Sequence, residues 1–227
     1  MPKCFLCQLK RSAISGACSQ CLIDLPWNTS FCQQCALPLA ANGVEFCGQC
    51  LSYPPLFSMA RTAFCYQFPI NRLIMNFKDK KNPALGKSLS RLLGRSLCHD
   101  LSLQRTPPEL LIPVPSHQRS LDARGYNPAQ VIATSLSKIL SIPVRHDLII
   151  KRQPSAQQKE LTADERRVNL ENAFVLTANG SQVIPKHYRV AIIDDVITTG
   201  ATANSMTKTL LKGGIQEVII WAIARTP

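Results

Sequence analysis

The sequence predicts an α/β protein with a mostly parallel sheet and flanking helices, preceded by a small cysteine-rich module. Eight cysteines form four CxxC pairs within the first fifty residues, which is the spacing of zinc ligands. From about residue 60 onwards, apolar segments rich in β-branched residues alternate with segments whose apolar residues recur at helical spacing. We therefore expect a module over residues 1–51, a proline-containing connector, and an α/β domain over residues 58–227.

The four CxxC pairs predict two structural zinc sites. One CxxC turn directs two thiolates to the same metal, and two turns complete a tetrahedral site. A thioredoxin-like redox role would need a single CxxC at a helix start. Consecutive pairing is the simplest, and a crossed pairing stays open. Consecutive pairing groups the ligands as Cys4, Cys7, Cys18 and Cys21, and as Cys32, Cys35, Cys47 and Cys50.

The first half of the α/β domain shows a strand, a helical stretch, a second strand and a second helix. Residues 59–68 have the composition of a strand, and residues 70–101 repeat apolar side chains at helical spacing with a break at Pro83. Residues 109–116 form a short apolar strand that ends in prolines. Residues 127–140 read as an amphipathic helix with proline in its first turn.

The second half repeats this alternation around a long polar segment. Residues 146–153 read as a strand, and residues 154–174 are polar. Residues 188–194 and 217–224 are strands rich in β-branched side chains, which is typical of strands buried on both faces. The complete pattern predicts a mostly parallel sheet.

The stretch "IIDDVITTGAT" places two acids after a buried strand and then leads into a helix. A ligand in an open α/β sheet lies beyond the carboxyl ends of the strands, where we expect Asp194 and Asp195. Because carboxylates accept hydrogen bonds, an acidic pair suits the 2′- and 3′-hydroxyls of a ribose. A metal site and a solvated turn are the alternatives for these acids.

The residues that follow predict an anion cradle. Backbone N–H groups at a helix start bind anions, glycine permits close approach, and threonine hydroxyls add donors. A helix cap is the simpler alternative. A ribose site followed at once by a phosphate site describes a 5-phosphoribosyl group, whereas the absence of GxxxxGK[ST] disfavours a P-loop NTPase. The cradle comprises Thr198, Thr199, Gly200, Ala201 and Thr202.

The charge balance favours anionic partners. The formal net charge is +12, from 26 basic and 14 acidic residues. A basic stretch over residues 72–95 contains the single acid Asp79 and few aromatics, so no base-stacking platform is evident. A generally basic surface is the alternative. No apolar run is long enough to span a membrane, and the N-terminus lacks a secretory signal pattern, so we expect a cytoplasmic protein.

The segment "VAIIDDVITTGAT" resembles the phosphoribosyl pyrophosphate (PRPP) motif of type I phosphoribosyltransferases. The whole chain resembles the ComF/GntX family of competence and DNA-utilisation proteins. The family motifs are the four CxxC pairs, "FK" at 77–78, "IPVPS" at 112–116, "RGYN" at 124–127 and "ERRVNLENAF" at 165–174. One departure is Pro128, where the family usually has glutamine.

The resemblance implies a type I phosphoribosyltransferase-like fold, zinc ribbons, PRPP and Mg²⁺ binding, and a role in natural transformation. It assigns the two acids to the ribose, residues 198–202 to the 5′-phosphate, and a mobile loop to residues 151–169. The turn expected to meet pyrophosphate is Val114, Pro115 and Ser116. Candidate contacts to pyrophosphate or DNA are Lys78, Arg124, Arg152, Lys159, Arg166 and Arg167.

Three functions stay open at this point. The leading interpretation is a PRPP-binding protein that handles single-stranded DNA, with competence-machinery proteins as possible partners. The second is an active phosphoribosyltransferase of salvage or biosynthesis, with an acceptor pocket built from residues 51–110 and the cysteine module. Thr198 stands where hypoxanthine-guanine enzymes typically carry an aspartate base, which disfavours a 6-oxopurine acceptor. The third is a pseudo-enzyme that retains the sugar-phosphate pocket.

Overall fold

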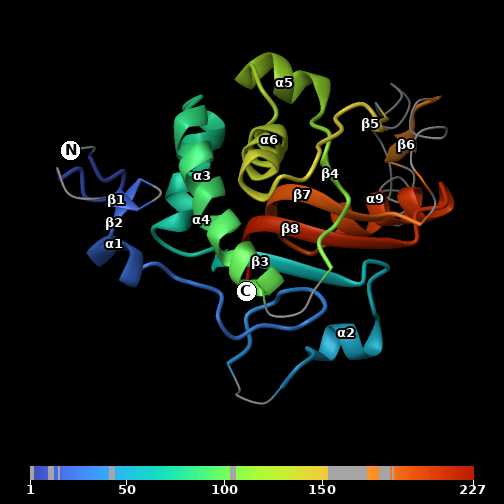
Figure 1. Cartoon of the computed structure of the whole chain (residues 1–227), viewed down its shortest axis with the longest axis horizontal. Helices are drawn as coiled ribbons and strands as arrows, with labels where there is room; N and C mark the ends of the chain where they lie inside the picture. The colour runs from blue at the N-terminus through green and yellow to red at the C-terminus, as the bar shows by residue number, and fades with distance from the viewer. Residues whose placement is uncertain are drawn as a thin grey trace, which may run out of the picture.

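The computed structural model describes residues 3–9, 13–14, 16–40, 44–102, 106–152, 173–178, 185 and 187–227. A four-stranded parallel sheet with the order β3-β8-β7-β4 organises the chain (Figure 1). Its strands are β3 (Met59–Cys65), β4 (Leu110–Pro113), β7 (Arg189–Ile197) and β8 (Glu217–Arg225). Because both faces are covered, most side chains of these strands are buried. The predicted parallel α/β architecture is confirmed.

One face of the sheet packs against α3 (Ile70–Asp79), α4 (Pro83–Ser102) and α6 (Pro128–Leu140) (Figure 1). Pro83 opens α4 rather than interrupting a helix, since proline fits a first turn. The short helix α5 (Gln118–Arg124) connects β4 to α6. This face carries the larger hydrophobic core, with Trp221 and Leu111 fully buried in it.

The other face packs against α9 (Ala201–Lys212) and against the second group of cysteines. The four cysteines of this group share a core with Phe57, Ala60 and Ile220. The N-terminal segment also contains β1 (Ala13–Ile14), β2 (Ala17–Cys18), α1 (Ser19–Ile23) and α2 (Gly48–Ser52). The division after residue 51 stays a prediction.

A separate antiparallel pair, β5 (Ile149–Lys151) with β6 (Phe174–Leu176), departs from the parallel pattern. The strand expected over 146–153 is therefore shorter and pairs outside the main sheet. Most of the polar segment 154–174 lies outside the described residues. Among helices of the described ranges, none combines the length and the apolar character that crossing a membrane requires.

Candidate functional site

Two cysteine tetrads are assembled in the N-terminal segment. Within each tetrad the sulfur atoms all lie within 4.8 Å of one another. The groups are Cys4, Cys7, Cys18 and Cys21, and Cys32, Cys35, Cys47 and Cys50, so the pairing is consecutive and not crossed. Four thiolates that close around one point fit tetrahedral Zn²⁺ and leave no position for a substrate.

Backbone N–H groups prepare these sulfurs for a metal. The N–H of Cys18 donates to the sulfur of Cys4, and that of Cys47 donates to the sulfur of Cys32, both at 3.3 Å. Burial raises the pKa of these thiols, but the backbone donors outweigh it, so the pKa falls to about 6 for Cys4 and about 7 for Cys32. Such thiolate-stabilising contacts are typical of zinc knuckles.

Asp194 and Asp195 lie inside β7, so the strand expected over residues 188–194 extends further than predicted. The strand continues to Ile197 because β8 pairs with it as far as Arg225. On its other side, β4 pairs with β7 only up to Ile193. The two acids therefore occupy β7 just beyond the carboxyl end of β4, at the edge where ligands of such sheets bind.

The two carboxylates have different surroundings because neighbouring side chains of a strand point to opposite faces. Asp195 is buried and pairs with Lys78 of α3, with 2.8 Å between Oδ2 and Nζ. The carboxylate of Asp194 accepts a hydrogen bond from the N–H of Asp195 at 2.8 Å. Burial, followed by the charge of Asp195, raises the pKa of Asp194 to about 7, while Lys78 and Lys151 act in the opposite direction.

The "FK" and "RGYN" motifs contact each other next to the ion pair of Lys78 and Asp195. The hydroxyl of Tyr126 donates to the carbonyl of Phe77, and the two rings stack at 5.7 Å between centroids. Arg124 lies 4.0 Å from Asp79, so it neutralises an acid of α3. These contacts fix the end of α3, and with it the position of Lys78.

The "VPS" turn is attached to the same strand. The N–H of Val114 donates to the carbonyl of Ile193, and the side-chain amide of Asn127 donates to the carbonyl of Val114, both at 2.9 Å. Asn127 also caps α6 by accepting from Ala129, with Pro128 in the first turn. A cavity of about 280 Å³ opens here, lined in part by Pro115, Ser116, Asn127, Gln130 and Lys151.

The "TTGAT" segment turns from β7 into α9. Gly200 has a φ of +79° and is the N-cap, and helix α9 begins at Ala201. The hydroxyl of Thr199 accepts from the N–H of Ala201 at 3.3 Å. A side chain built at Gly200 would meet no atom within 4 Å, so the space in front of the turn is open. A turn at a helix start with open space before it can accommodate an anion, so the cradle stays a prediction.

Arg225 forms hydrogen bonds with this turn, and it was not among the site residues predicted from the sequence. Its guanidinium donates to the carbonyls of Ile197, Thr198 and Cys35. The sequence offers one indication of this role: Arg225 directly follows the apolar segment 217–224, so its charge lies at the end of a buried strand.

The remaining basic candidates are scattered. Arg152 is exposed just after β5. Lys159, Arg166 and Arg167 lie outside the described residues, as does most of the loop expected over 151–169. Of these candidates, Lys78 forms an ion pair with Asp195. Arg124 instead lies beside Asp79, the residue that follows Lys78.

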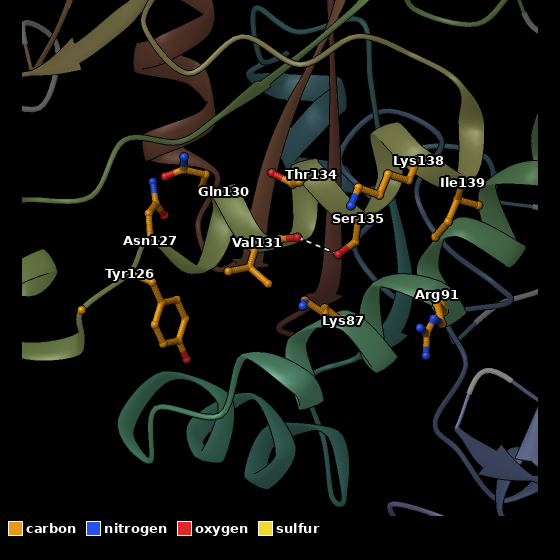
Figure 2. Close-up of a pocket in the computed structure, with 11 residues that line it drawn as sticks. Lys87, Arg91, Tyr126, Asn127, Gln130, Val131, Thr134, Ser135, Lys138 and Ile139 are labelled. Atoms are coloured by element: carbon orange, nitrogen blue, oxygen red, sulfur yellow. Dashed lines mark hydrogen bonds between the residues drawn. The ribbon is translucent and has the colours of Figure 1, made fainter. Parts of the chain in front are cut away.

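A second cavity, of about 650 Å³, lies between α4 and α6 (Figure 2). Lys87 and Arg91 line it from α4, and Lys138 lines it from α6. The first two belong to the basic stretch seen in the sequence, whereas Lys138 does not, because α6 looked like an ordinary amphipathic helix. Asn127 and Gln130 line both this cavity and the one at the "VPS" turn, so the two adjoin.

Comparison with known proteins gives consistent relatives over nearly the whole chain. Residues 2–51 match the family described as double zinc ribbon domain. The chain is 34% identical over 218 residues to competence protein F of Haemophilus influenzae, covering 94% of this chain and 92% of that protein. It is 33% identical over 228 residues to DNA utilization protein YhgH of Escherichia coli, covering 98% and 96%.

Similar solved structures are phosphoribosyltransferases and a related enzyme. Purine phosphoribosyltransferase from Pyrococcus horikoshii is 24% identical with a TM-score of 0.36, covering 60% of this chain and 72% of that one. Glutamine PRPP amidotransferase from B. subtilis is 16% identical with a TM-score of 0.42, covering 71% of this chain and 31% of that one.

Proposed function

The chain belongs to the family of competence protein F and DNA utilization protein YhgH, and from this premise we propose that it binds PRPP and handles single-stranded DNA. The family names support a role in competence or DNA utilisation. One observation carries the ligand proposal: the acids of β7 and the turn that opens α9 follow each other at one end of the sheet, with Lys78 on Asp195.

In this proposal the ribose hydroxyls donate to Asp194 and Asp195, and the N–H groups of Thr199 and Gly200 donate to the 5′-phosphate. A carboxylate offers about four lone-pair sites, so Asp195 can keep Lys78 while it accepts a hydroxyl. The "VPS" turn beside the cavity of about 280 Å³ is the proposed pyrophosphate contact.

Mg²⁺ is proposed to accompany PRPP. Oxygen ligands suit it, and Asp194 and Asp195 supply carboxylate oxygens beside the proposed pyrophosphate position. When bound, Mg²⁺ would neutralise charge on the leaving pyrophosphate. The chain's own part is to orient the ribose through the two acids and to hold the positive charge of Lys78 beside Asp195.

Calorimetry with PRPP and Mg²⁺ tests the ligand proposal. Asp195→Asn should weaken binding by about 1–3 kcal/mol, because it exchanges a charged hydrogen-bond acceptor for an amide. Asp122→Asn, an exposed acid of α5, is the matched control and should leave the affinity unchanged. Wild-type protein without measurable affinity, or equal losses in both variants, would refute the proposal.

The DNA proposal is supported by the basic cavity between α4 and α6. Lys87, Arg91 and Lys138 present three cations around it, and Asn127 and Gln130 connect it to the pyrophosphate side of the ribose site. We propose that the backbone of a single strand follows this cavity, so that phosphates meet the three cations. Phosphate contacts release counterions, so the affinity should fall steeply as salt is added.

The DNA test compares two triple variants of equal charge. Replacing Lys87, Arg91 and Lys138 with alanine should lower the salt dependence of oligonucleotide binding by roughly 0.7 for each phosphate that the protein no longer neutralises. The control replaces Lys80, Lys81 and Lys212, which are exposed and do not line the cavity, with alanine. Equal effects would show that only the general basic charge matters.

A second candidate function, transfer to an acceptor, is favoured by a cavity that is partly lined by residues 198–202, here called the phosphate turn. This cavity of about 230 Å³ is lined by Tyr53, Pro55 and Phe57 together with Thr199 and Gly200. It lies in the region where an acceptor pocket was expected. Pyrophosphate release from PRPP, measured with a panel of nucleobases, separates the candidates: release that depends on one base favours the transferase, and none favours binding without transfer.

A further inference from the structure

Arg225 is a buried cation whose described partners are all neutral oxygens. Arg225 is the last residue of β8 and is 4% exposed. The guanidinium donates to the carbonyls of Cys35 at 3.1 Å and Ile197 at 3.2 Å, to that of Thr198, and to both oxygens of Thr226. Among the ion pairs of the described residues, none involves Arg225. Burying a charge without a counter-charge costs several kcal/mol.

The second cysteine tetrad can provide that counter-charge. Its four cysteines are buried, and their sulfurs lie within 4.8 Å of one another. Zn²⁺ bound by four thiolates is formally dianionic. Arg225 bonds directly to the carbonyl of Cys35, and Cys35, Cys50 and Arg225 line one cavity with Thr199 and Gly200. The metal centre and the phosphate turn therefore lie on either side of one guanidinium.

The peptide geometry shows what this guanidinium does for the turn. In a trans peptide the carbonyl of one residue and the N–H of the next point in opposite directions. Since Arg225 holds the carbonyls of Ile197 and Thr198, the N–H groups of Thr198 and Thr199 face away from it. Fixing the two carbonyls thus aims backbone donors out of the turn.

We propose that Arg225 is a positioning residue that couples zinc in the second tetrad to the order of the phosphate turn. This inference depends on the proposed function, because it takes residues 198–202 as the part that binds a phosphate. The zinc-thiolate charge stabilises the buried guanidinium, and the guanidinium fixes the peptide planes of the turn. Loss of the metal leaves Arg225 uncompensated, so the turn loosens and binds phosphate less well.

The first tetrad offers an internal control. Cys4, Cys18 and Ala17 form a small core, packed against Phe5 and Leu22, and Figure 1 shows this segment at the opposite end of the view from α9. Its zinc should therefore not affect the turn. Arg61 offers a second control, because it is also a buried arginine near the second tetrad. It donates to Gln33, which lies between Cys32 and Cys35, and to the carbonyl of Ala60 rather than to the phosphate turn.

Hydrogen exchange of the amides of residues 197–204, measured on the full chain without ligand, tests the coupling. Arg225→Lys retains the charge but loses the planar fork, and should raise exchange in this segment about tenfold. Cys50→Ser, which removes a zinc ligand, should do the same. Cys21→Ser and Arg61→Lys should leave exchange there within about twofold of wild type.

Two further measurements make each outcome decisive. Metal analysis should find zinc retained at both tetrads in Arg225→Lys, so that any loosening is not metal loss. Calorimetry with ribose 5-phosphate should show weaker binding by about tenfold in Arg225→Lys and Cys50→Ser only. Absence of ribose 5-phosphate binding in wild type would overturn the proposed function, while the exchange data would still decide the coupling. Unchanged exchange in Arg225→Lys with both zinc ions bound would overturn the coupling itself.

Discussion

At the scale of single residues, the two neighbouring acids of β7 are held in different states by their partners. Asp195 has Lys78 at 2.8 Å, whereas burial and the charge of Asp195 raise the pKa of Asp194 to about 7. Near neutral pH the pair therefore carries less than its full formal charge. Such an arrangement is unfavourable for stability and is typical of a site built to meet a ligand.

The raised pKa of Asp194 predicts a pH-dependent stability difference. Folded protein keeps a proton on Asp194 up to about pH 7, whereas the unfolded chain releases it near pH 4. The stability that this proton contributes is complete below about pH 4 and is lost as the pH rises through about 7. Asp194→Asn removes the dependence, so its stability relative to wild type should increase with pH.

Urea unfolding of wild type and Asp194→Asn at about pH 5 and about pH 8 measures this difference. Between the two pH values, the unfolding free energy of Asp194→Asn relative to wild type should increase by on the order of 1–3 kcal/mol. Comparison at the same pH cancels the loss of zinc that both proteins share in acid. Asp122→Asn is the control and should show a constant difference. A difference for Asp194→Asn that is equal at both pH values would contradict the raised pKa.

The sequence indicated the two acids but not their partners. Two carboxylates before "TTGAT" are visible in one local stretch. Lys78 and Arg225 are distant from the acids in the chain and reach them only through α3 and β8, so no local pattern joined them to the acids. Lys78 entered the prediction through the family resemblance, whereas Arg225 did not enter it at all.

At the scale of elements, α3 and the "RGYN" segment act as one unit. Tyr126 donates to the Phe77 carbonyl, and burial raises the pKa of its phenol, so the donor stays protonated. Tyr126→Phe should cost about 0.5–1.5 kcal/mol of unfolding free energy and weaken PRPP binding, because the end of α3 carries Lys78. Thermal unfolding and calorimetry check this.

Tyr188→Phe is the matched control for this prediction, because Tyr188 is half-buried before β7 and lines none of the three cavities described above. It should change neither stability nor affinity. If Tyr126→Phe lowers stability but leaves PRPP binding intact, the hydroxyl only supports packing and does not position Lys78.

Element types were predictable from the sequence, whereas pairings were not. Periodicity and Pro83 placed α3 and α4, and β-branched runs placed β7 and β8. The length of β7 was underestimated because two acids precede its last residues, Val196 and Ile197, which pair with β8 but lie beyond the end of β4. The antiparallel pairing of β5 with β6 joins segments separated by a long polar stretch, which periodicity cannot reveal.

At the scale of the whole molecule, the two tetrads contribute differently to the fold. The second shares its core with Phe57, Ala60 and Ile220, whereas the first forms a small cluster joined to the larger core through the partly buried Phe5 and Leu22. Cys47→Ser should therefore lower the temperature of global unfolding much more than Cys7→Ser, since losing the second metal exposes sheet core. Differential scanning calorimetry with metal analysis measures both.

Cys98→Ser provides the baseline for these variants, because Cys98 is an exposed cysteine outside both tetrads. It should leave the unfolding temperature unchanged. Equal losses in Cys47→Ser and Cys7→Ser would show that the two metal sites support the molecule equally, against the difference in their packing.

The central claim is tested most directly by titrating isotope-labelled protein with ribose 5-phosphate and following single residues by NMR. The amides of Thr199 and Gly200 report the phosphate end, and the carboxylates of Asp194 and Asp195 report the sugar end. We predict that both sets of signals shift and saturate with one common affinity, because a single ligand contacts both. Shifts at only one end, or two different affinities, would contradict a shared ribose–phosphate site at the junction of β7 and α9.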